Sequence, residues 1–256
     1  MRLARVAHPE GVAFVSVEGD GADATVQEIA DHPFGKPSFT GKRWPLADVR
    51  VLAPILPSKV IAIGRNYAAH AQEFGNEVPG EPMMFLKPST SVIGPNAAIK
   101  LPPASSRVDF EGELAVVIGQ PVRNVPAARA AQAILGYTIA NDVSARDLQK
   151  SDGQWGRAKG FDTFCPLGPW IETSLDPADL SLKSEVDGEL KQDGRTSQLV
   201  HKIPELVEFV SSVMTLLPGD TILTGTPEGV GPITDGQSVS ITVEGIGTLT
   251  NSVQNA

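Results

Sequence analysis

The sequence predicts a mainly β protein with some α-helix. Ten short runs, either apolar throughout or alternating between apolar and polar residues, are typical of strands. The 25 glycines and 21 prolines separate these runs, as expected where turns connect short strands. Helical periodicity occurs in few places, so the regular strand–helix alternation of a doubly wound sheet is absent.

The predicted strands occur along the whole chain. They cover Leu3–Ala7, Val12–Val17, Val49–Leu52, Val60–Ile63, Leu114–Ile118, Ile134–Ala140, Leu180–Val186, Thr221–Thr224, Val239–Val243 and Thr248–Val253. Two hairpins are expected between them. Asp187-Gly188 has the composition of a two-residue turn whose central positions favour positive φ, and Gly245-Ile246-Gly247 predicts the second hairpin.

Four helices are predicted. The clearest covers Ile203–Leu217, where apolar residues recur at three- and four-residue spacing and Pro204 suits the first turn. Shorter helices are expected over Asn66–Phe74, Pro126–Ile134 and Ala145–Ser151.

The chain is expected to have two parts. Its 256 residues suffice for one compact domain with a small appendage. The stretch Asp31–Pro45, rich in Gly, Pro and Lys, is interpreted as a linker after a small β-rich unit. We therefore divide the chain into an N-terminal domain, residues 1–57, and a main domain, residues 58–256.

Charge and composition narrow the functional class. A net charge of -9 without any basic cluster argues against nucleic acid or an anionic membrane surface as a partner. The single cysteine, Cys165, excludes a disulfide within the chain and any multi-cysteine metal site, and it fits a reducing compartment. The first residues lack the apolar core of a secretory signal, and no apolar run approaches the ~20 residues that span a bilayer. A soluble, cytoplasmic protein is expected.

The most informative motif is "VDFEGELAVVIG", residues 108–119. Asp109, Glu111 and Glu113 alternate, so they share one face of a strand with about 6.6 Å between successive positions. Asp142 follows another apolar strand. Carboxylates without Cys or His favour a hard cation, Mg²⁺ or alternatively Mn²⁺ or Ca²⁺, over zinc. Spacing alone fits a solvated strand face equally well, and both interpretations stay open.

Other chemical signals are weaker. His70 and Glu73 are three residues apart and meet on one face of a short helix, where the carboxylate would orient the imidazole as a general base. Spacing alone favours an exposed surface pair. Lys87 and Lys159 lie among apolar residues, and a lysine near a metal can stabilise an oxyanion, although most lysines are simply solvated. The glycine-rich "TGTPEGVGP" lacks the lysine of a P-loop and predicts a tight turn.

Taken together and in order, these motifs resemble the fumarylacetoacetate hydrolase family. The resemblance spans residues 59–253. The chain is most similar to small bacterial members of the family, of the isomerase, acylpyruvate hydrolase and oxaloacetate decarboxylase types. The resemblance implies a mixed β-sandwich roll, a variable N-terminal appendage and a homodimer, with residues 58–256 as the catalytic domain. The matching segments are "GRNYAAH", "FLKPST", "DFEGELAVVIG", "NDVSARD", "RAKGFDTFCPLGPW", "GELKQDGRTSQ" and "LTGTPEGVGP".

The resemblance also implies roles for individual residues. One Mg²⁺ or Mn²⁺ would be held by two glutamates and an aspartate, with a lysine beside it and a His–Glu pair on a mobile lid handling water or protons. Asp109 departs from the family pattern, and we do not assign it to the metal. The implied metal ligands are Glu111, Glu113 and Asp142, the catalytic residues His70, Glu73 and Lys159, and the substrate-binding residues Lys87, Arg146, Gln149 and Thr226.

The resemblance implies a metal-dependent enzyme for short 2-oxo or enol dicarboxylic acids or acylpyruvates. It would act through a metal-bound enolate, by hydrolysis of a C–C bond or by decarboxylation. The alternative is isomerisation of 2-hydroxyhepta-2,4-diene-1,7-dioate or 5-carboxymethyl-2-hydroxymuconate in aromatic catabolism. A more remote alternative is a non-catalytic protein that binds a ligand through the metal. In each case the partner is a small molecule.

Overall fold

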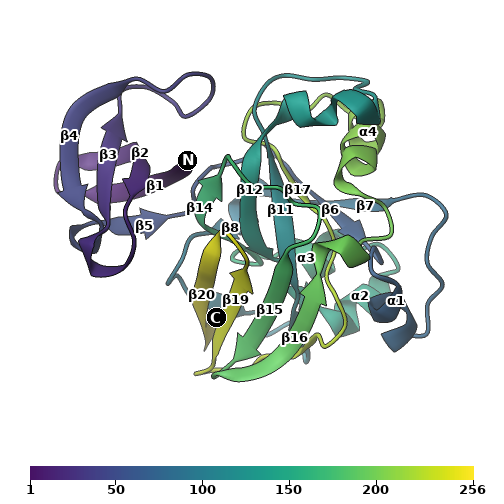
Figure 1. The fold of residues 1–256 in the computed structure, drawn as a ribbon. Coiled ribbons are helices and arrows are strands. Elements are labelled where there is room, and N and C mark those ends of the chain that lie inside the picture. Colours follow the sequence, from purple (N-terminus) through teal and green to yellow (C-terminus); the bar gives the residue numbers. More distant parts are fainter.

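The computed structural model describes all 256 residues, and strands dominate it (Figure 1). Twenty strands form three sheets, and the helices are few and short. All ten predicted strands and both predicted hairpins are present. The turn residues Asp187 and Gly188 have positive φ values of 52° and 80°. The predicted fold class is therefore confirmed.

The largest sheet runs through both lobes of the molecule. Its strands are β1 (Arg2–His8), β2 (Gly11–Glu18), β3 (Thr25–Ile29), β4 (Phe39–Pro45), β5 (Arg50–Leu52), β6 (Val60–Gly64), β7 (Met83–Lys87), β8 (Val92–Ile93), β11 (Gly112–Ile118), β12 (Ile134–Asn141), β14 (Cys165–Glu172) and β17 (Thr221–Leu223). Their spatial order is β4-β3-β2-β1-β14-β12-β11-β17-β6-β7, with β5 beside β1 and β8 beside β14. Pairing of β1 with β14 joins the N-terminal lobe to the rest of the molecule.

Two smaller sheets complete the main domain. Five strands follow the order β16-β15-β19-β20-β9, and three follow the order β13-β10-β18. Strands β15 and β19 pack against β11 and β12, so two sheets face each other across a core that includes Leu114, Ile139 and Ile241. The strand bounds are β9 (Ile99–Leu101), β10 (Val108–Phe110), β13 (Ser144–Ala145), β15 (Ser181–Val186), β16 (Glu189–Arg195), β18 (Gly231–Pro232), β19 (Ser238–Val243) and β20 (Gly247–Asn255).

A helix lies near each of the four predicted positions, although the one predicted over Pro126–Ile134 is a 3-10 helix. The α-helix Gly156–Gly160 was not predicted. The longest, α4, ends at Val213 rather than Leu217, because Met214 has extended backbone and Leu216 pairs with Val122 in a β-bridge. No helix has the length and hydropathy that crossing a membrane requires. The α-helices are α1 (Ala68–Glu73), α2 (Arg146–Asp152), α3 (Gly156–Gly160) and α4 (Ile203–Val213). The 3-10 helices are η1 (Gly21–Asp23), η2 (Leu46–Asp48), η3 (Ser89–Ser91), η4 (Ala127–Ala133) and η5 (Thr196–Gln198).

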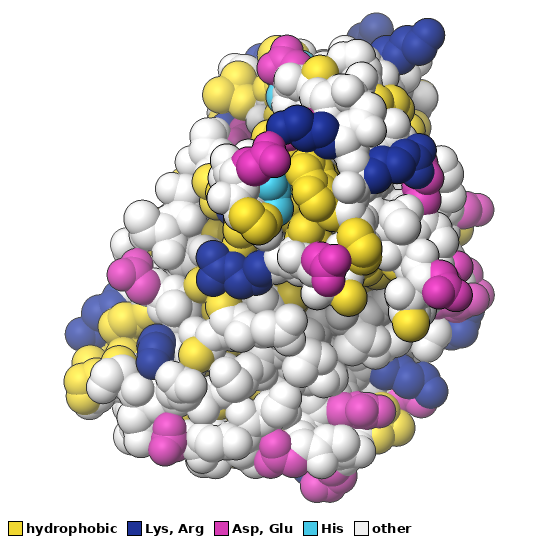
Figure 2. Space-filling model, turned by 90° about the vertical axis from the view of Figure 1, so that its left-hand side faces the viewer, with side chains coloured by type: hydrophobic (Ala, Val, Ile, Leu, Met, Phe, Trp, Pro, Cys, Tyr) yellow, Lys and Arg dark blue, Asp and Glu magenta, His cyan; other side chains and the backbone are white.

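The N-terminal lobe contains two strands, β3 and β4, that the sequence pattern did not predict. Half of the predicted linker Asp31–Pro45 is strand β4, which pairs with β3. Six of its seven residues are exposed, so the alternation of apolar and polar residues that marks a half-buried strand is missing. Figure 2 views the molecule from the side of this lobe, where basic and acidic side chains surround a small group of hydrophobic side chains and a histidine.

Candidate active site

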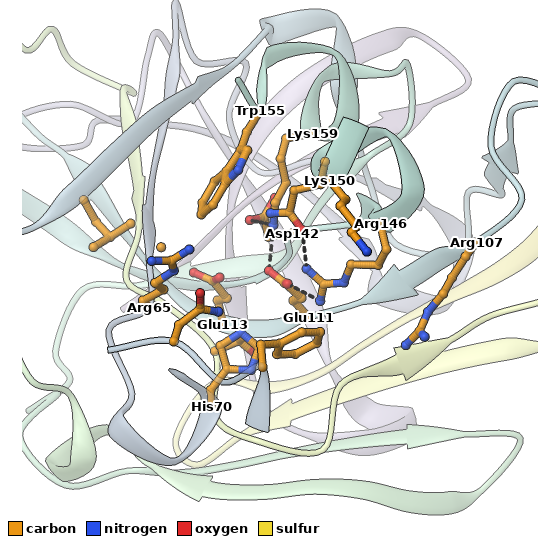
Figure 3. A pocket seen from close by; sticks show the side chains of 16 residues that line it. Arg65, His70, Arg107, Glu111, Glu113, Asp142, Arg146, Lys150, Trp155 and Lys159 are labelled. Carbon is orange, nitrogen blue, oxygen red and sulfur yellow. Dashed lines mark hydrogen bonds and ion pairs between the residues drawn. The ribbon is translucent and has the colours of Figure 1, made fainter. Parts of the chain in front are cut away.

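A pocket of about 390 Å³ opens between the large sheet and helices α1, α2 and α3 (Figure 3). Sixteen residues line it, and only three of them are hydrophobic. Eight of the residues predicted to form the site are among them: His70, Glu111, Glu113, Asp142, Arg146, Gln149, Lys159 and Thr226. Residues that are far apart in the sequence thus meet in one polar cavity.

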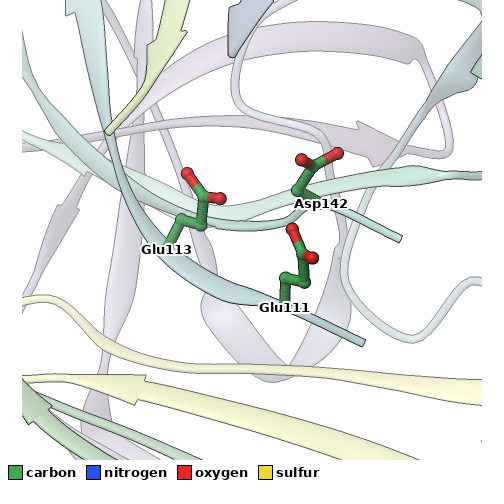
Figure 4. Close-up of side chains that lie close together, drawn as sticks. All are labelled: Glu111, Glu113 and Asp142. Carbon is green, nitrogen blue, oxygen red and sulfur yellow. The ribbon is translucent and has the colours of Figure 1, made fainter. Parts of the chain in front are cut away.

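Three carboxylates form the floor of this pocket (Figure 4). One oxygen from each of Glu111, Glu113 and Asp142 lies within 4.8 Å of the others. The antiparallel pairing of β11 with β12 places Gly112 opposite Asn141, and the Asp142 N–H donates to the Glu111 carbonyl at 2.9 Å. This register brings Asp142 beside the two glutamates. All three side chains are at most 5% exposed, so the solvated-face interpretation is wrong.

Gly112 allows the two glutamates to point to one side. A Cβ at this position would lie 2.3 Å from the Ser184 Oγ on β15, so only glycine fits against the second sheet. The Gly112 N–H donates to Gln192 Oε1 at 2.9 Å, and Gln192 Nε2 donates to the Thr226 hydroxyl at 2.7 Å. The fully buried Gln192 therefore positions Thr226. This role of Gln192 was not predicted, because its strand β16 consists mostly of exposed residues.

Lys159 neutralises part of the negative charge. Its Nζ donates to Glu111 Oε2 at 2.8 Å and to Asp142 Oδ2 at 2.7 Å. Burial alone would lower the pKa of Lys159, but the charges of Asp142 and Glu111 outweigh it and raise that pKa. Burial opposes ionisation of Glu111 as well, yet Lys159 and Arg146 hold the pKa of this carboxyl below its ordinary value. Both groups are therefore charged at neutral pH.

Glu113 is the least compensated acid of the three. Its carboxylate accepts one hydrogen bond, from the Gly225 N–H at 2.6 Å, and makes no ion pair. Burial, together with the nearby charges of Asp142 and Glu111, raises the pKa of Glu113 well above its ordinary value. A divalent cation among the three carboxylates would remove this repulsion. The all-oxygen donor set fits a hard cation such as Mg²⁺.

Lys87 lies elsewhere than the family resemblance implied. It does not line the pocket, and its side chain is completely buried behind Asp142. Its Nζ donates to Asp142 Oδ1 at 2.6 Å, to the Lys159 carbonyl at 2.5 Å and to the Val143 carbonyl at 3.3 Å. With three protein acceptors, this ammonium group has no access to a substrate. Lys87 instead supports Asp142 from behind.

Asp109 has a different set of partners from its two neighbouring acids. It is fully buried, and its carboxylate accepts hydrogen bonds from Arg107 Nε at 2.9 Å, Arg107 Nη2 at 3.1 Å and Arg146 Nε at 2.9 Å. It does not belong to the cluster of three carboxylates. Asp109 therefore orients the Arg146 guanidinium, whose Nη1 also donates to Gln149 at 3.0 Å. Arg146 Nη2 lies 2.5 Å from Glu111 Oε1 without hydrogen-bond alignment, and it has no other partner.

Helix α1 brings the His–Glu pair to the pocket. His70 lines the pocket, and its Nδ1 lies 3.3 Å from Glu73 Oε2. The histidine is only 8% exposed, which excludes the exposed surface pair. Glu73 lies behind it and also accepts the Gly229 N–H at 3.2 Å. Phe74 contacts the His70 ring edge-on at 5.2 Å and covers the Arg146 guanidinium at 5.0 Å, so this segment closes one side of the pocket.

Comparison with known proteins identifies the family of this chain. The family described as "Fumarylacetoacetate (FAA) hydrolase C-terminal" matches residues 59–254, and "Rv2993c-like, N-terminal" matches residues 1–54. The chain is 62% identical to Protein Rv2993c of Mycobacterium tuberculosis, over 99% of this chain and 98% of that protein. It is 46% identical to the mitochondrial oxaloacetate tautomerase FAHD1 of Arabidopsis thaliana, over 74% of this chain and 87% of that protein.

A solved structure is similar over the full length. It is that of 5-carboxymethyl-2-hydroxymuconate delta-isomerase from Mycobacterium smegmatis, with 67% sequence identity, a TM-score of 0.96 and complete coverage of both chains. The family match covers three quarters of the chain and includes every residue of the pocket. The chain therefore belongs to the fumarylacetoacetate hydrolase family and is an enzyme of that family.

Proposed function

We propose that this protein is a divalent-metal-dependent isomerase of short 2-oxo acids and their enol forms. One observation carries the proposal: the buried acids Glu111, Glu113 and Asp142 and the buried His70 line the same pocket. A cation at the acids and a proton acceptor across the pocket are the two components that enolisation needs. The names of the similar proteins, a delta-isomerase and an oxaloacetate tautomerase, support this reaction class.

The three acids would hold Mg²⁺, or alternatively Mn²⁺ or Ca²⁺. Such an ion, when bound, polarises a carbonyl oxygen and favours negative charge on it. Lys159 adds a second positive charge beside the acids, because its pKa is raised and it stays protonated. The Trp155 and Phe85 rings approach its ammonium group to 6.0 and 5.2 Å and limit its access to water. A developing oxyanion would thus meet preformed positive charge.

Arg146 and Thr226 would bind the carboxylate next to the carbonyl. Arg146 Nη2 is buried beside Glu111 Oε1 at 2.5 Å without an aligned hydrogen bond, and Gln192 holds the Thr226 hydroxyl in place. Asp109 and Gln149 fix the guanidinium plane, which suits a planar carboxylate. The reacting carbon would then face His70 rather than the protein wall.

His70 would move the proton. In keto–enol isomerisation the enol oxygen loses a proton and the carbon next to the new carbonyl carbon gains one, so substrate and product contain the same atoms. Glu73 orients the imidazole through Nδ1, which leaves Nε2 for the exchange. Contacts of Phe74 and Glu73 with Arg146 and Gly229 keep helix α1 over the pocket and reduce the access of bulk water.

Cleavage of a C–C bond is the second candidate function. The buried His70 with its partner Glu73 favours it, because the same imidazole can activate a water molecule for hydrolysis. Decarboxylation also generates an enolate, that of the shortened acid. Enolate formation is common to all three reactions. The pocket residues therefore support formation of an enolate in general and do not select one of the three reactions.

A substrate panel tests the proposal. Oxaloacetate, acetylpyruvate, fumarylpyruvate and a 2-hydroxy-diene-dioate are incubated with the protein, with Mg²⁺ and with a chelator instead. Isomerisation appears as loss of enol absorbance without release of pyruvate or CO₂, whereas cleavage yields these or a second acid. Full activity with the chelator, or in Glu111→Gln, would refute the metal-dependent reaction.

A further inference from the structure

The pocket contains more positive than negative side chains. Three of its five cations are already engaged: Lys159 with Glu111 and Asp142, and Arg107 and Arg146 with Asp109. The remaining two, Arg65 and Lys150, line the pocket but take part in no ion pair or side-chain hydrogen bond. A bound divalent ion would increase the positive excess further. A substrate with a single carboxylate would leave this charge uncompensated.

Arg65 is held rigidly in the pocket wall. It follows strand β6 and has φ 58°, in the left-handed region that side chains other than Gly, Asn and Asp rarely adopt. Before it, Gly64 packs so closely on Trp155 that a Cβ would lie 2.7 Å from the indole ring. After it, the buried Asn66 side chain bonds to the Thr224 carbonyl at 2.8 Å and to the His201 backbone. Backbone strain kept at such a fixed position points to a functional constraint on this residue.

Arg65 and Arg146 lie on opposite sides of the three acids (Figure 3). A molecule held over the acids would therefore present one end to each arginine. Lys150 lies on the same side as Arg146, in the last turn of α2, and its side chain is exposed. Among the two unengaged cations, only Arg65 can receive the distal end of such a molecule.

Resting on the proposed function, we propose that Arg65 binds a second carboxylate and makes the enzyme selective for dianionic 2-oxo acids. The planar guanidinium matches a carboxylate in a two-point contact. An acylpyruvate with an uncharged tail would leave Arg65 without a partner in a half-buried site. A site built for a charged group rejects an analogue that lacks it, because its own polar group then stays unpaired.

Two substrates and three variants test this selectivity. Oxaloacetate and acetylpyruvate share the 2-oxo acid head and differ in the tail, a carboxylate in one and an acetyl group in the other. We measure kcat/KM for both with Mg²⁺, corrected for the uncatalysed rate, in the wild type, Arg65→Asn, Arg65→Lys and Lys150→Gln. Asparagine tolerates left-handed backbone, so the first variant removes the guanidinium with little new strain.

In Arg65→Asn we expect kcat/KM for oxaloacetate to fall about 10- to 100-fold, the scale of one lost charged hydrogen bond. The value for acetylpyruvate should change less than about 3-fold, since no charged contact is lost there. Arg65→Lys, which keeps the charge without the planar fork, should recover part of the oxaloacetate rate. Lys150→Gln removes one positive charge from the pocket mouth and should affect both substrates equally.

Equal losses for both substrates in Arg65→Asn would overturn the inference while leaving the proposed function intact. No turnover of any 2-oxo acid by the wild type would instead refute the proposed function. In that case calorimetric titration with oxaloacetate and acetylpyruvate in the presence of Mg²⁺ still decides the role of Arg65. Weaker binding of oxaloacetate alone in Arg65→Asn supports the inference, and unchanged binding rejects it.

Discussion

Replacement of Lys87 by methionine tests whether this residue supports the acids or binds substrate. Methionine has a similar length, but it cannot donate hydrogen bonds. Asp142 Oδ1 and the Val143 and Lys159 carbonyls then lose their buried donor. Removing one partner of a buried ion pair costs about 3–5 kcal/mol. Lys159 still compensates Asp142 Oδ2, so we expect the lower end, about 3 kcal/mol.

Thermal and urea unfolding in the presence of a chelator measure this loss. For a chain of this size about 3 kcal/mol corresponds to a fall in Tm of about 6–12 °C. Lys183→Met is the matched control, since its Nζ lies 3.6 Å from Asp193 on the surface and should contribute at most about 1 kcal/mol. If the free energy of unfolding of Lys87→Met lies within about 1 kcal/mol of the wild-type value while its KM is raised, the supporting role is refuted and substrate binding is favoured instead.

Three further variants separate the roles of the pocket residues. His70→Ala should lower kcat by about 10²–10⁴ with the metal site intact, as for loss of a general base. Asp109→Asn should lower kcat/KM by about 10-fold, the scale of one charged hydrogen bond, because Arg146 loses its anchor, while the Mg²⁺-induced rise in Tm remains. In Glu113→Gln this rise should disappear. Without metal, the free energy of unfolding of the wild type should also fall as pH rises above about 4.3, the ordinary pKa of glutamate. The share of this fall that is due to Glu113 should be absent in Glu113→Gln.

The sign of the last prediction follows from the direction of the shift. The folded-state pKa of Glu113 is raised, so its favourable contribution is complete below the unfolded-state pKa and is lost as pH rises through the folded-state value. Parallel stability curves for wild type and Glu113→Gln would contradict it. A twofold effect of His70→Ala on kcat, or loss of the Mg²⁺ effect in Asp109→Asn, would refute the other two assignments.

Local pattern was sufficient to predict ten of the twenty strands. Apolar runs such as Val60–Ile63 and Leu114–Ile118 became central strands because burying them on both faces is favourable wherever they pair. The strands that were not predicted include β14, which Pro166 and Pro169 interrupt, and the exposed strand β4. These two segments are strands because they pair with neighbouring strands, which the pattern of their own side chains does not reveal.

The alternation of Glu111 and Glu113 around Gly112 already indicated two carboxylates on one side of a strand. Only the tertiary structure decided what surrounds them. The β11–β12 register brought Asp142 to the pair, Lys87 proved to lie behind that aspartate, and Asp109 proved to serve Arg146. Spacing along one strand determines the direction of its side chains, whereas burial and the choice of counter-charge depend on which distant strands and helices pack there.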